Sequence, residues 1–95
     1  MILARVSGTL VATQRSDAVP AARYLVVTPA DQRGESRGSA LVALDTVGAG
    51  RDEIVLVAQG SSARQTKLSD KKAIDAVVIG IVDQVEDSGT VTYKK

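Results

Sequence analysis

The chain has 95 residues, a formal net charge of +1 and no cysteine or histidine. The absence of cysteine excludes disulfides and thiolate metal sites, and the near balance of charges gives no general attraction to nucleic acid or anionic lipid. The length fits one domain, so we expect a single domain over residues 1–95. Its core should be thin, and association with further copies would help to stabilise it.

Five main strands are predicted. Apolar residues make up 44% of the chain but aromatic residues only 2%. The apolar residues are mostly Val, Ala, Leu and Ile, and β-branched side chains favour strands. The predicted strands, in chain order, are 2–13, 24–28, 40–45, 53–59 and 75–85. Gly8 interrupts the first of them, and a lone glycine in a strand often marks a bulge or a sharp bend.

The connections between these strands are short. We expect a loop over 14–22, a turn or hairpin tip over 31–38 and a Gly-rich connection over 47–52. A short helical turn over 60–67, with Ser61 or Ser62 as its N-cap, is followed by a polar stretch through Lys72. A turn at 86–89 precedes a final strand over 90–93. The pattern predicts a mostly β fold, a small five-stranded, OB-like β-barrel with one short helix and a C-terminal β-hairpin.

No membrane or export segment is predicted. The first residues, from Met1 to Gly8, lack the long apolar stretch of a signal peptide. No part of the sequence reaches the roughly eighteen continuous apolar residues that a membrane helix needs. We therefore expect a soluble, cytoplasmic protein without a membrane partner.

The sequence offers little for catalysis. Histidine, the commonest general base, is absent, and so is cysteine. The remaining carboxylates are Asp45, Asp52, Glu53, Asp75 and Asp83, and two carboxylates can serve a glycosidase or a protease. However, Asp45, Asp75 and Asp83 stand at strand ends, where Asp commonly accepts backbone N–H groups in turns. The segment from Gly48 to Gly50 is not a phosphate loop, because a strand follows it and no helix does. We predict no catalytic residue, no cofactor and no bound metal.

A barrel of this size raises one alternative, a binding module for single-stranded nucleic acid. Such modules use aromatic side chains for base stacking and a basic groove. This chain has only two aromatic residues, Tyr24 and Tyr93, and a nearly neutral charge. The residues alone indicate a small, mostly β protein that associates with itself.

Several segments, in the same order from end to end, resemble the EutN/CcmL family of bacterial microcompartment vertex proteins. They are Val6–Thr13, Ala43–Gly50, Glu53–Val57, Gly60–Arg64 and Asp75–Asp83. The resemblance implies a structural protein, a homopentamer that caps the five-fold vertices of a polyhedral, carboxysome-like shell. The implied partners are further copies of the chain and the hexameric shell proteins of the facets, without nucleic acid.

The resemblance also implies a narrow pore on the five-fold axis, lined by Gly48, Ala49, Gly50 and Arg51. Five converging copies of one loop need small residues. The family often has Gly where this chain has Asp52, and Asp is among the few other residues that tolerate the left-handed backbone region. We therefore expect the loop to keep its shape.

Two further sets of residues are candidates for contacts between subunits or with the facets. Ser61, Ser62 and Arg64 are expected near a subunit boundary, although Arg64 fits equally well a solvated side chain with a buried stem. The hairpin tip 31–38 and the tail 86–95 are candidates for the pentamer flank that meets the hexamers.

Overall fold

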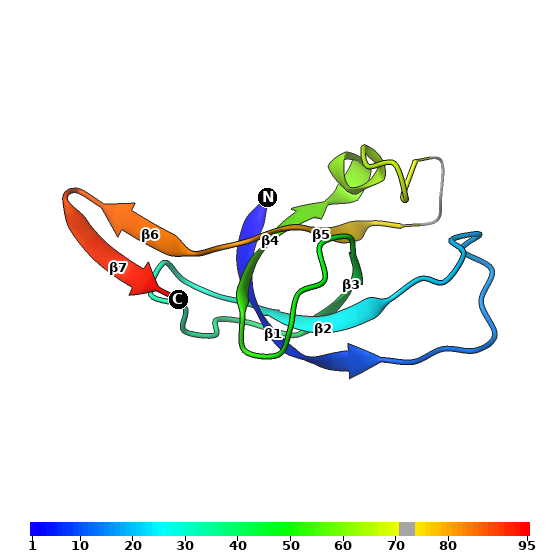
Figure 1. Ribbon diagram of the computed structural model, residues 1–95, viewed down its shortest axis with the longest axis horizontal. Helices are drawn as coiled ribbons and strands as arrows, with labels where there is room; N and C mark the ends of the chain where they lie inside the picture. The colour runs from blue at the N-terminus through cyan, green and yellow to red at the C-terminus, as the bar shows by residue number, and fades with distance from the viewer. Residues whose placement is uncertain (71–73) are drawn as a thin grey trace.

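The computed structural model describes residues 1–70 and 74–95. Lys71 and Lys72, at the end of the expected polar stretch, lie outside the described residues. The described part of the chain forms seven strands and one short 3-10 helix (Figure 1). They are β1 (Ile2–Leu10), β2 (Tyr24–Pro29), β3 (Leu41–Asp45), β4 (Ile54–Gln59), η1 (Gly60–Arg64), β5 (Ala76–Ile81), β6 (Gln84–Asp87) and β7 (Thr90–Lys94).

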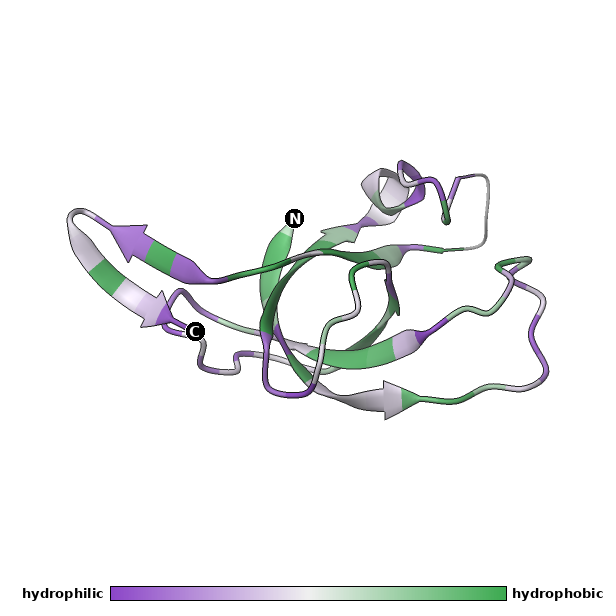
Figure 2. Cartoon of the chain, viewed as in Figure 1, coloured by the Kyte–Doolittle hydropathy of each residue, from purple (hydrophilic) through white to green (hydrophobic). Residues whose placement is uncertain are grey.

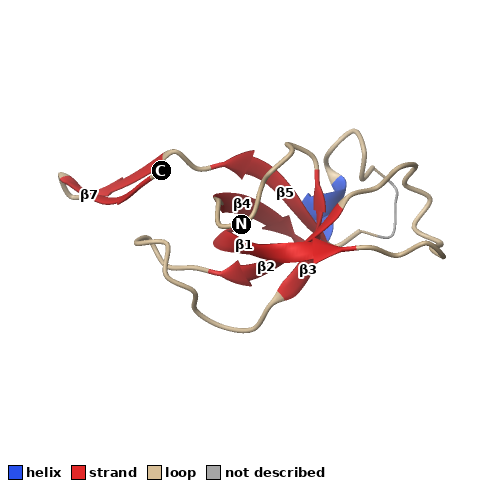
Figure 3. Ribbon diagram, turned by 60° about the horizontal axis from the view of Figure 1, so that its bottom comes forward, coloured by secondary structure: helices blue, strands red, loops and turns tan. Residues whose placement is uncertain are grey.

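The first five strands form a closed barrel in the order β1-β2-β3-β5-β4, with β4 pairing back onto β1. The pair β3–β5 is parallel, and the other four pairs are antiparallel. Figure 3 shows the strands wrapping around one another, with η1 beside β4 and β5. This architecture confirms the predicted OB-like barrel with one short helix.

The core of the barrel follows the alternation of the strands. In β2, Leu25 and Val27 are fully buried, whereas the residues between and beside them keep part of their surface exposed. Figure 2 shows the hydrophobic residues concentrated on the barrel strands and the hydrophilic residues on the loops. A second, smaller cluster around Leu44 and Val77 lies at the η1 end of the barrel.

Bulges allow the strands to curve. The pairing of β1 with β2 shifts between Val6 and Gly8, so that Ser7 is the additional residue, as the lone glycine predicted. In β5, Ile79 is the additional residue, because Leu56 pairs with Gly80 and Val57 with Val78. A bulge bends its strand and increases its twist, which closure of so small a barrel requires.

Two predicted strands are longer than the observed ones. β1 ends at Leu10 and does not reach Thr13, and Val11, just beyond it, is 87% exposed. The predicted strand 75–85 is wrong, because it is two strands. β5 ends at Ile81 in the barrel, and β6 begins at Gln84 in a separate two-stranded sheet with β7. This hairpin projects from the barrel and makes the molecule elongated, at 44 × 23 × 21 Å (Figures 1 and 3).

The helical segment is shorter than expected and is capped differently. η1 covers Gly60–Arg64, its N-cap is Gln59, and no side chain caps it. The predicted capping by Ser61 or Ser62 is wrong, because the Ser62 hydroxyl donates a hydrogen bond to the Gln59 carbonyl at 2.6 Å. Among the described residues, no helix is long and apolar enough to cross a membrane.

Candidate functional site

The Gly-rich connection between β3 and β4 is a tightly turned loop. Gly48 has a φ of 74° and Asp52 a φ of 70°. Asp52, at a position where the family often has Gly, therefore adopts the left-handed region that Asp tolerates. Gly50 lies outside that region, so in the Gly48–Gly50 segment only Gly48 is left-handed. A Cβ atom at Gly50 would lie 3.3 Å from Oε1 of Glu53.

Asp45, the last residue of β3, anchors the start of this loop. Its Oδ1 accepts the backbone N–H groups of Val47 at 3.1 Å, Gly48 at 3.0 Å and Ala49 at 3.3 Å. Its Oδ2 forms an ion pair with the guanidinium of Arg23. The Asp45 side chain is only 1% exposed, so water does not compete for these hydrogen bonds. This one carboxylate therefore holds the backbone of three consecutive residues.

Arg23 strengthens the same anchor. Its Nη1 atom also donates to the Ala49 carbonyl at 3.0 Å, while half of its side chain stays exposed. The prediction that strand-end carboxylates accept turn N–H groups is thus confirmed for Asp45. At Asp75 and Asp83 the backbone carbonyls are the acceptors, from the N–H groups of Gly60 and Lys95.

Glu53 holds the other end of the loop. Its Oε1 accepts the Gly50 N–H at 2.5 Å, and its Oε2 lies 2.6 Å from Nζ of Lys95. The hydrogen bond from Lys95, followed by that from Gly50, lowers the pKa of Glu53, and the same pair raises the pKa of Lys95. The loop is therefore tied to the end of the C-terminal segment.

Arg5 joins the loop to a distant turn. Its Nη1 atom donates to the Asp52 carbonyl at 3.0 Å, and its Nη2 atom donates to the Gly34 carbonyl at 2.6 Å. Both acceptors are backbone groups, so Arg5 sets the position of two loops that are 18 residues apart in sequence without depending on their side chains. Three anchors, at Asp45, Glu53 and Arg5, thus fix the connection 46–53.

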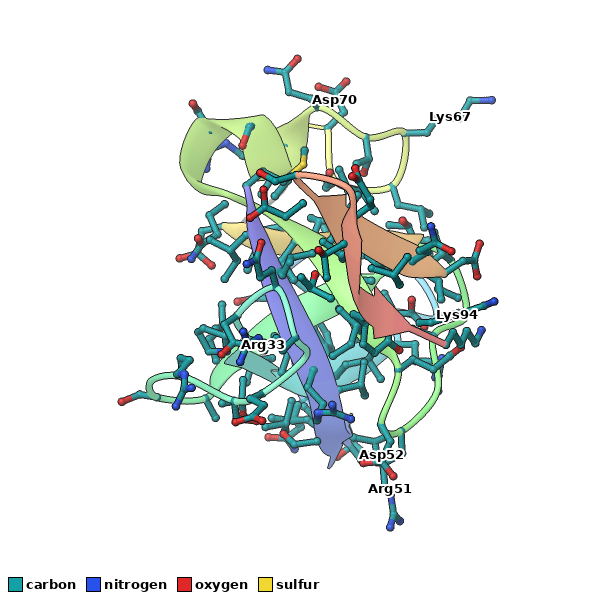
Figure 4. All side chains as sticks on the ribbon, turned by 90° about the vertical axis from the view of Figure 1, so that its left-hand side faces the viewer. Arg33, Arg51, Asp52, Lys67, Asp70 and Lys94 are labelled. Carbon is teal, nitrogen blue, oxygen red and sulfur yellow. The ribbon has the colours of Figure 1, made fainter. Side chains whose placement is uncertain are left out.

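The predicted pore residues fall into two groups. Gly48 and Arg51 are exposed and Gly50 is half-buried, and Figure 4 shows Arg51 and Asp52 projecting from one end of the molecule. Ala49 is 0% exposed and belongs to the barrel core. The whole residue is buried, with its N–H bonded to Asp45 and its carbonyl to Arg23, so Ala49 exposes no surface to a pore in the single subunit.

The predicted boundary residues on η1 lie elsewhere. Ser61, Ser62 and Arg64 are exposed, and Nη1 of Arg64 donates to the Ile74 carbonyl at 3.4 Å. In Figure 4 the η1 end of the molecule is opposite the end that carries Arg51. The structure therefore does not bring the two predicted sets together.

The two flank candidates, in contrast, lie against each other. Thr92 Oγ1 in β7 donates to the Gln32 carbonyl at 2.9 Å. Gly34 has a φ of 82° and lies under the Tyr93 ring, where a Cβ atom would come within 3.0 Å of Cδ1. The tip 31–38 and the C-terminal hairpin thus form one surface, which we call the flank.

Sequence reasoning did not single out Arg5 or Arg23. Arg23 had a usable signal, because the antiparallel register that pairs Tyr24 with Leu44 places Arg23 opposite Asp45. Arg5 had none, because its acceptors are carbonyls in two loops whose positions depend on the closed barrel. In residues 1–70 and 74–95, no group of three or more His, Cys, Asp or Glu side chains is arranged to hold a metal ion.

These features define a class of protein: a small, closed, OB-like barrel that carries a short, firmly anchored Gly-rich loop and a projecting hairpin. The family model described as "Ethanolamine utilisation protein EutN/carboxysome" matches residues 1–83. The chain belongs to this EutN/CcmL family.

Two relatives show how closely the chain follows the family. The shell vertex protein GrpN of Rhodospirillum rubrum is 46% identical over 86 residues, which cover 90% of this chain and 97% of GrpN. Its solved structure, described as a pentameric microcompartment shell protein, matches with a TM-score of 0.81 over 92% of this chain and 100% of that chain. The carboxysome shell vertex protein CcmL of Gloeobacter violaceus is 41% identical over 100% of this chain and 95% of CcmL. Its structure matches with a TM-score of 0.93, covering 100% and 98% of the two chains.

Proposed function

We propose that this chain is a structural shell protein that forms a homopentamer and caps the five-fold vertices of a bacterial microcompartment. The match with GrpN carries the proposal, because it runs almost end to end at 45% identity and the GrpN structure is described as pentameric. Gloeobacter CcmL, named as a carboxysome shell vertex protein, agrees in fold over the whole of this chain.

The anchored loop supports a place on the five-fold axis. A head-to-tail interface that closes produces a ring, and the loops nearest the axis must approach one another closely. Gly48 and Gly50 bring no side chain there, and the three anchors keep the loop from spreading. In this arrangement the pore is lined by Gly48 and Gly50 and by the side chains of Arg51 and Asp52, five of each sign. The mouth of the pore then has alternating charges and no net charge from these two residues.

The proposal includes partners and a location. Hexameric shell proteins of the facets would surround each pentamer, in the cytoplasm, and the flank is the surface that we assign to them. Ser61, Ser62 and Arg64 stay candidates for a subunit boundary on the basis of the resemblance. We assign no catalytic activity, cofactor or nucleic-acid partner. The relatives are named as shell vertex proteins, so the alternative of a nucleic-acid-binding module gains no support.

Native mass spectrometry at micromolar concentrations tests the oligomer directly, with a pentamer as the expected mass. A monomer, dimer or hexamer as the dominant species would contradict the proposal. The vertex role is tested by electron microscopy of shells co-expressed with and without this chain. Without it, and with no paralogue that forms pentamers, shells should be elongated or open at the vertices. Closed polyhedra of normal shape in its absence would refute the role.

A further inference from the structure

An apolar groove runs along the outside of the barrel at the root of the C-terminal hairpin. Its volume is about 640 Å³, and its apolar lining consists of Leu3, Leu56, Ile81, Val82 and Val85. Each of these side chains keeps part of its surface exposed. Leu56 lies on the outer face of β4, because the residues on either side of it, Val55 and Val57, are fully buried and successive side chains of a strand point to opposite faces.

The floor of the groove is built across three strands. Leu3 of β1 pairs with Leu56 of β4, and Leu56 pairs with Gly80 of β5. A Cβ atom at Gly80 would lie 3.4 Å from Cδ1 of Leu56, so the Leu56 side chain lies over the glycine, which has no side chain of its own there. The row of apolar side chains therefore ends in a depression.

The hairpin forms one wall of the groove, and within residues 1–70 and 74–95 no third strand pairs with it. β6 contributes Val85 and Glu86 to the lining. β6 and β7 pair only with each other, and Val91 of β7 is 49% exposed. A two-stranded hairpin is marginally stable alone in water, and here the tip 31–38 supports it through Thr92 and Tyr93. The projecting hairpin and the groove together present an apolar surface with a charged edge, which is the usual anatomy of a protein interface.

We infer that this groove, with the part of β6 that lines it, receives a second copy of this chain and forms one half of the subunit interface. The part of the flank that remains for the facet proteins is then the tip 31–38 with β7. The inference rests on the proposed pentamer. A ring needs two different faces on each subunit. The chain carries a second apolar face on β2 and β3, the two barrel strands that do not form the floor of the groove. There Val26 and Val42 are cross-strand neighbours, and Val42 is 43% exposed. A chain this short buries little apolar surface by itself, so covering the groove with a second copy would add to its stability.

The absence of cysteine from the chain makes a direct test possible. Val85→Cys places a single thiol in the groove, and Leu68→Cys places a matched control on a residue that is 45% exposed and outside the groove. In the assembled protein we expect a maleimide reagent to modify Val85→Cys about tenfold or more slowly than the control, as for a site in the dry centre of an interface. In denaturant the two thiols should react equally fast.

A second variant separates protection by the ring from protection by the subunit itself. Leu56→Asp should prevent assembly, and in that background Val85→Cys should react nearly as fast as the control. Leu68→Asp should leave the ring intact. Equal reaction rates at Val85→Cys and Leu68→Cys in an intact pentamer would overturn the inference while leaving the pentamer in place. A wild-type chain that forms no pentamer would instead overturn the proposed function. If Leu56→Asp does not fold, equal labelling rates of the two single-cysteine pentamers would still overturn the inference.

Discussion

Replacing Asp45 by alanine should destabilise the chain by about 2–4 kcal/mol. A hydrogen bond to a charged group contributes about 1.5–3 kcal/mol net. The full loss applies at Ala49, which is completely buried, so its N–H cannot turn to water. Val47 and Gly48 are exposed, and water replaces their lost bonds at a small cost. Arg23 is half-exposed and stays solvated, so no buried cation is left without a partner.

Two control variants divide this effect into its parts. Asp45→Asn keeps a carbonyl oxygen for the loop N–H groups but removes the charge, and we expect it to cost about 1–2 kcal/mol. Arg23→Ala removes the exposed partner of the ion pair and should cost about 1 kcal/mol or less. The loss of unfolding free energy should therefore be largest for Asp45→Ala, smaller for Asp45→Asn and smallest for Arg23→Ala.

Urea unfolding followed by circular dichroism measures these differences. The protomer concentration must be the same for all variants, because the stability of an oligomer depends on it. If the slope of the unfolding free energy against urea concentration stays the same and only the urea midpoint shifts, the substitution has changed stability alone. A loss below about 0.5 kcal/mol for Asp45→Ala would refute the reasoning, because it would show that the loop does not depend on this anchor.

Three further predictions concern the glycines and pH. Gly34→Ala should be more destabilising than Gly89→Ala in thermal unfolding, because both have φ near 80° but only Gly34 lies against the Tyr93 ring; equal losses would contradict the contact. Gly48→Val should lower the yield of pentamer in native mass spectrometry, because φ is 74° there and the side chain would appear five times near the axis; an unchanged yield and melting temperature would show that the loop is neither tight nor axial. The lowered pKa of Glu53 stabilises the fold above the usual value of 4.5, and this contribution should disappear as pH falls through the lowered pKa. When the urea midpoint is plotted against pH, Glu53→Gln should flatten the curve in this acidic range. A curve as steep as that of the wild type would contradict the role of Glu53.

The sequence by itself determined the local features and the family. The content of β-branched residues predicted the strands, Gly8 predicted a bulge, and the chemistry of Asp52 predicted a left-handed residue. Each of these depends on a residue and its immediate neighbours, so sequence is sufficient. The family followed from several motifs in a fixed order, which the family match over residues 1–83 confirms.

Only the tertiary structure decided which side chains face inward and which segments meet. The run from Ile54 to Ala58 is apolar throughout, so the sequence pattern does not predict that Leu56 faces out while Val55 and Val57 are buried. Only closure of the barrel decides which set faces the core. The burial of Ala49 depends likewise on the closed barrel. The turn at 86–89 correctly predicted the C-terminal hairpin, but the apolar run 76–82 gave no sign that β5 ends at Ile81 and that β6 begins a separate sheet with β7. The contact between the tip 31–38 and the hairpin joins segments some sixty residues apart, such as Gln32 and Thr92, and arises only when the barrel closes between them.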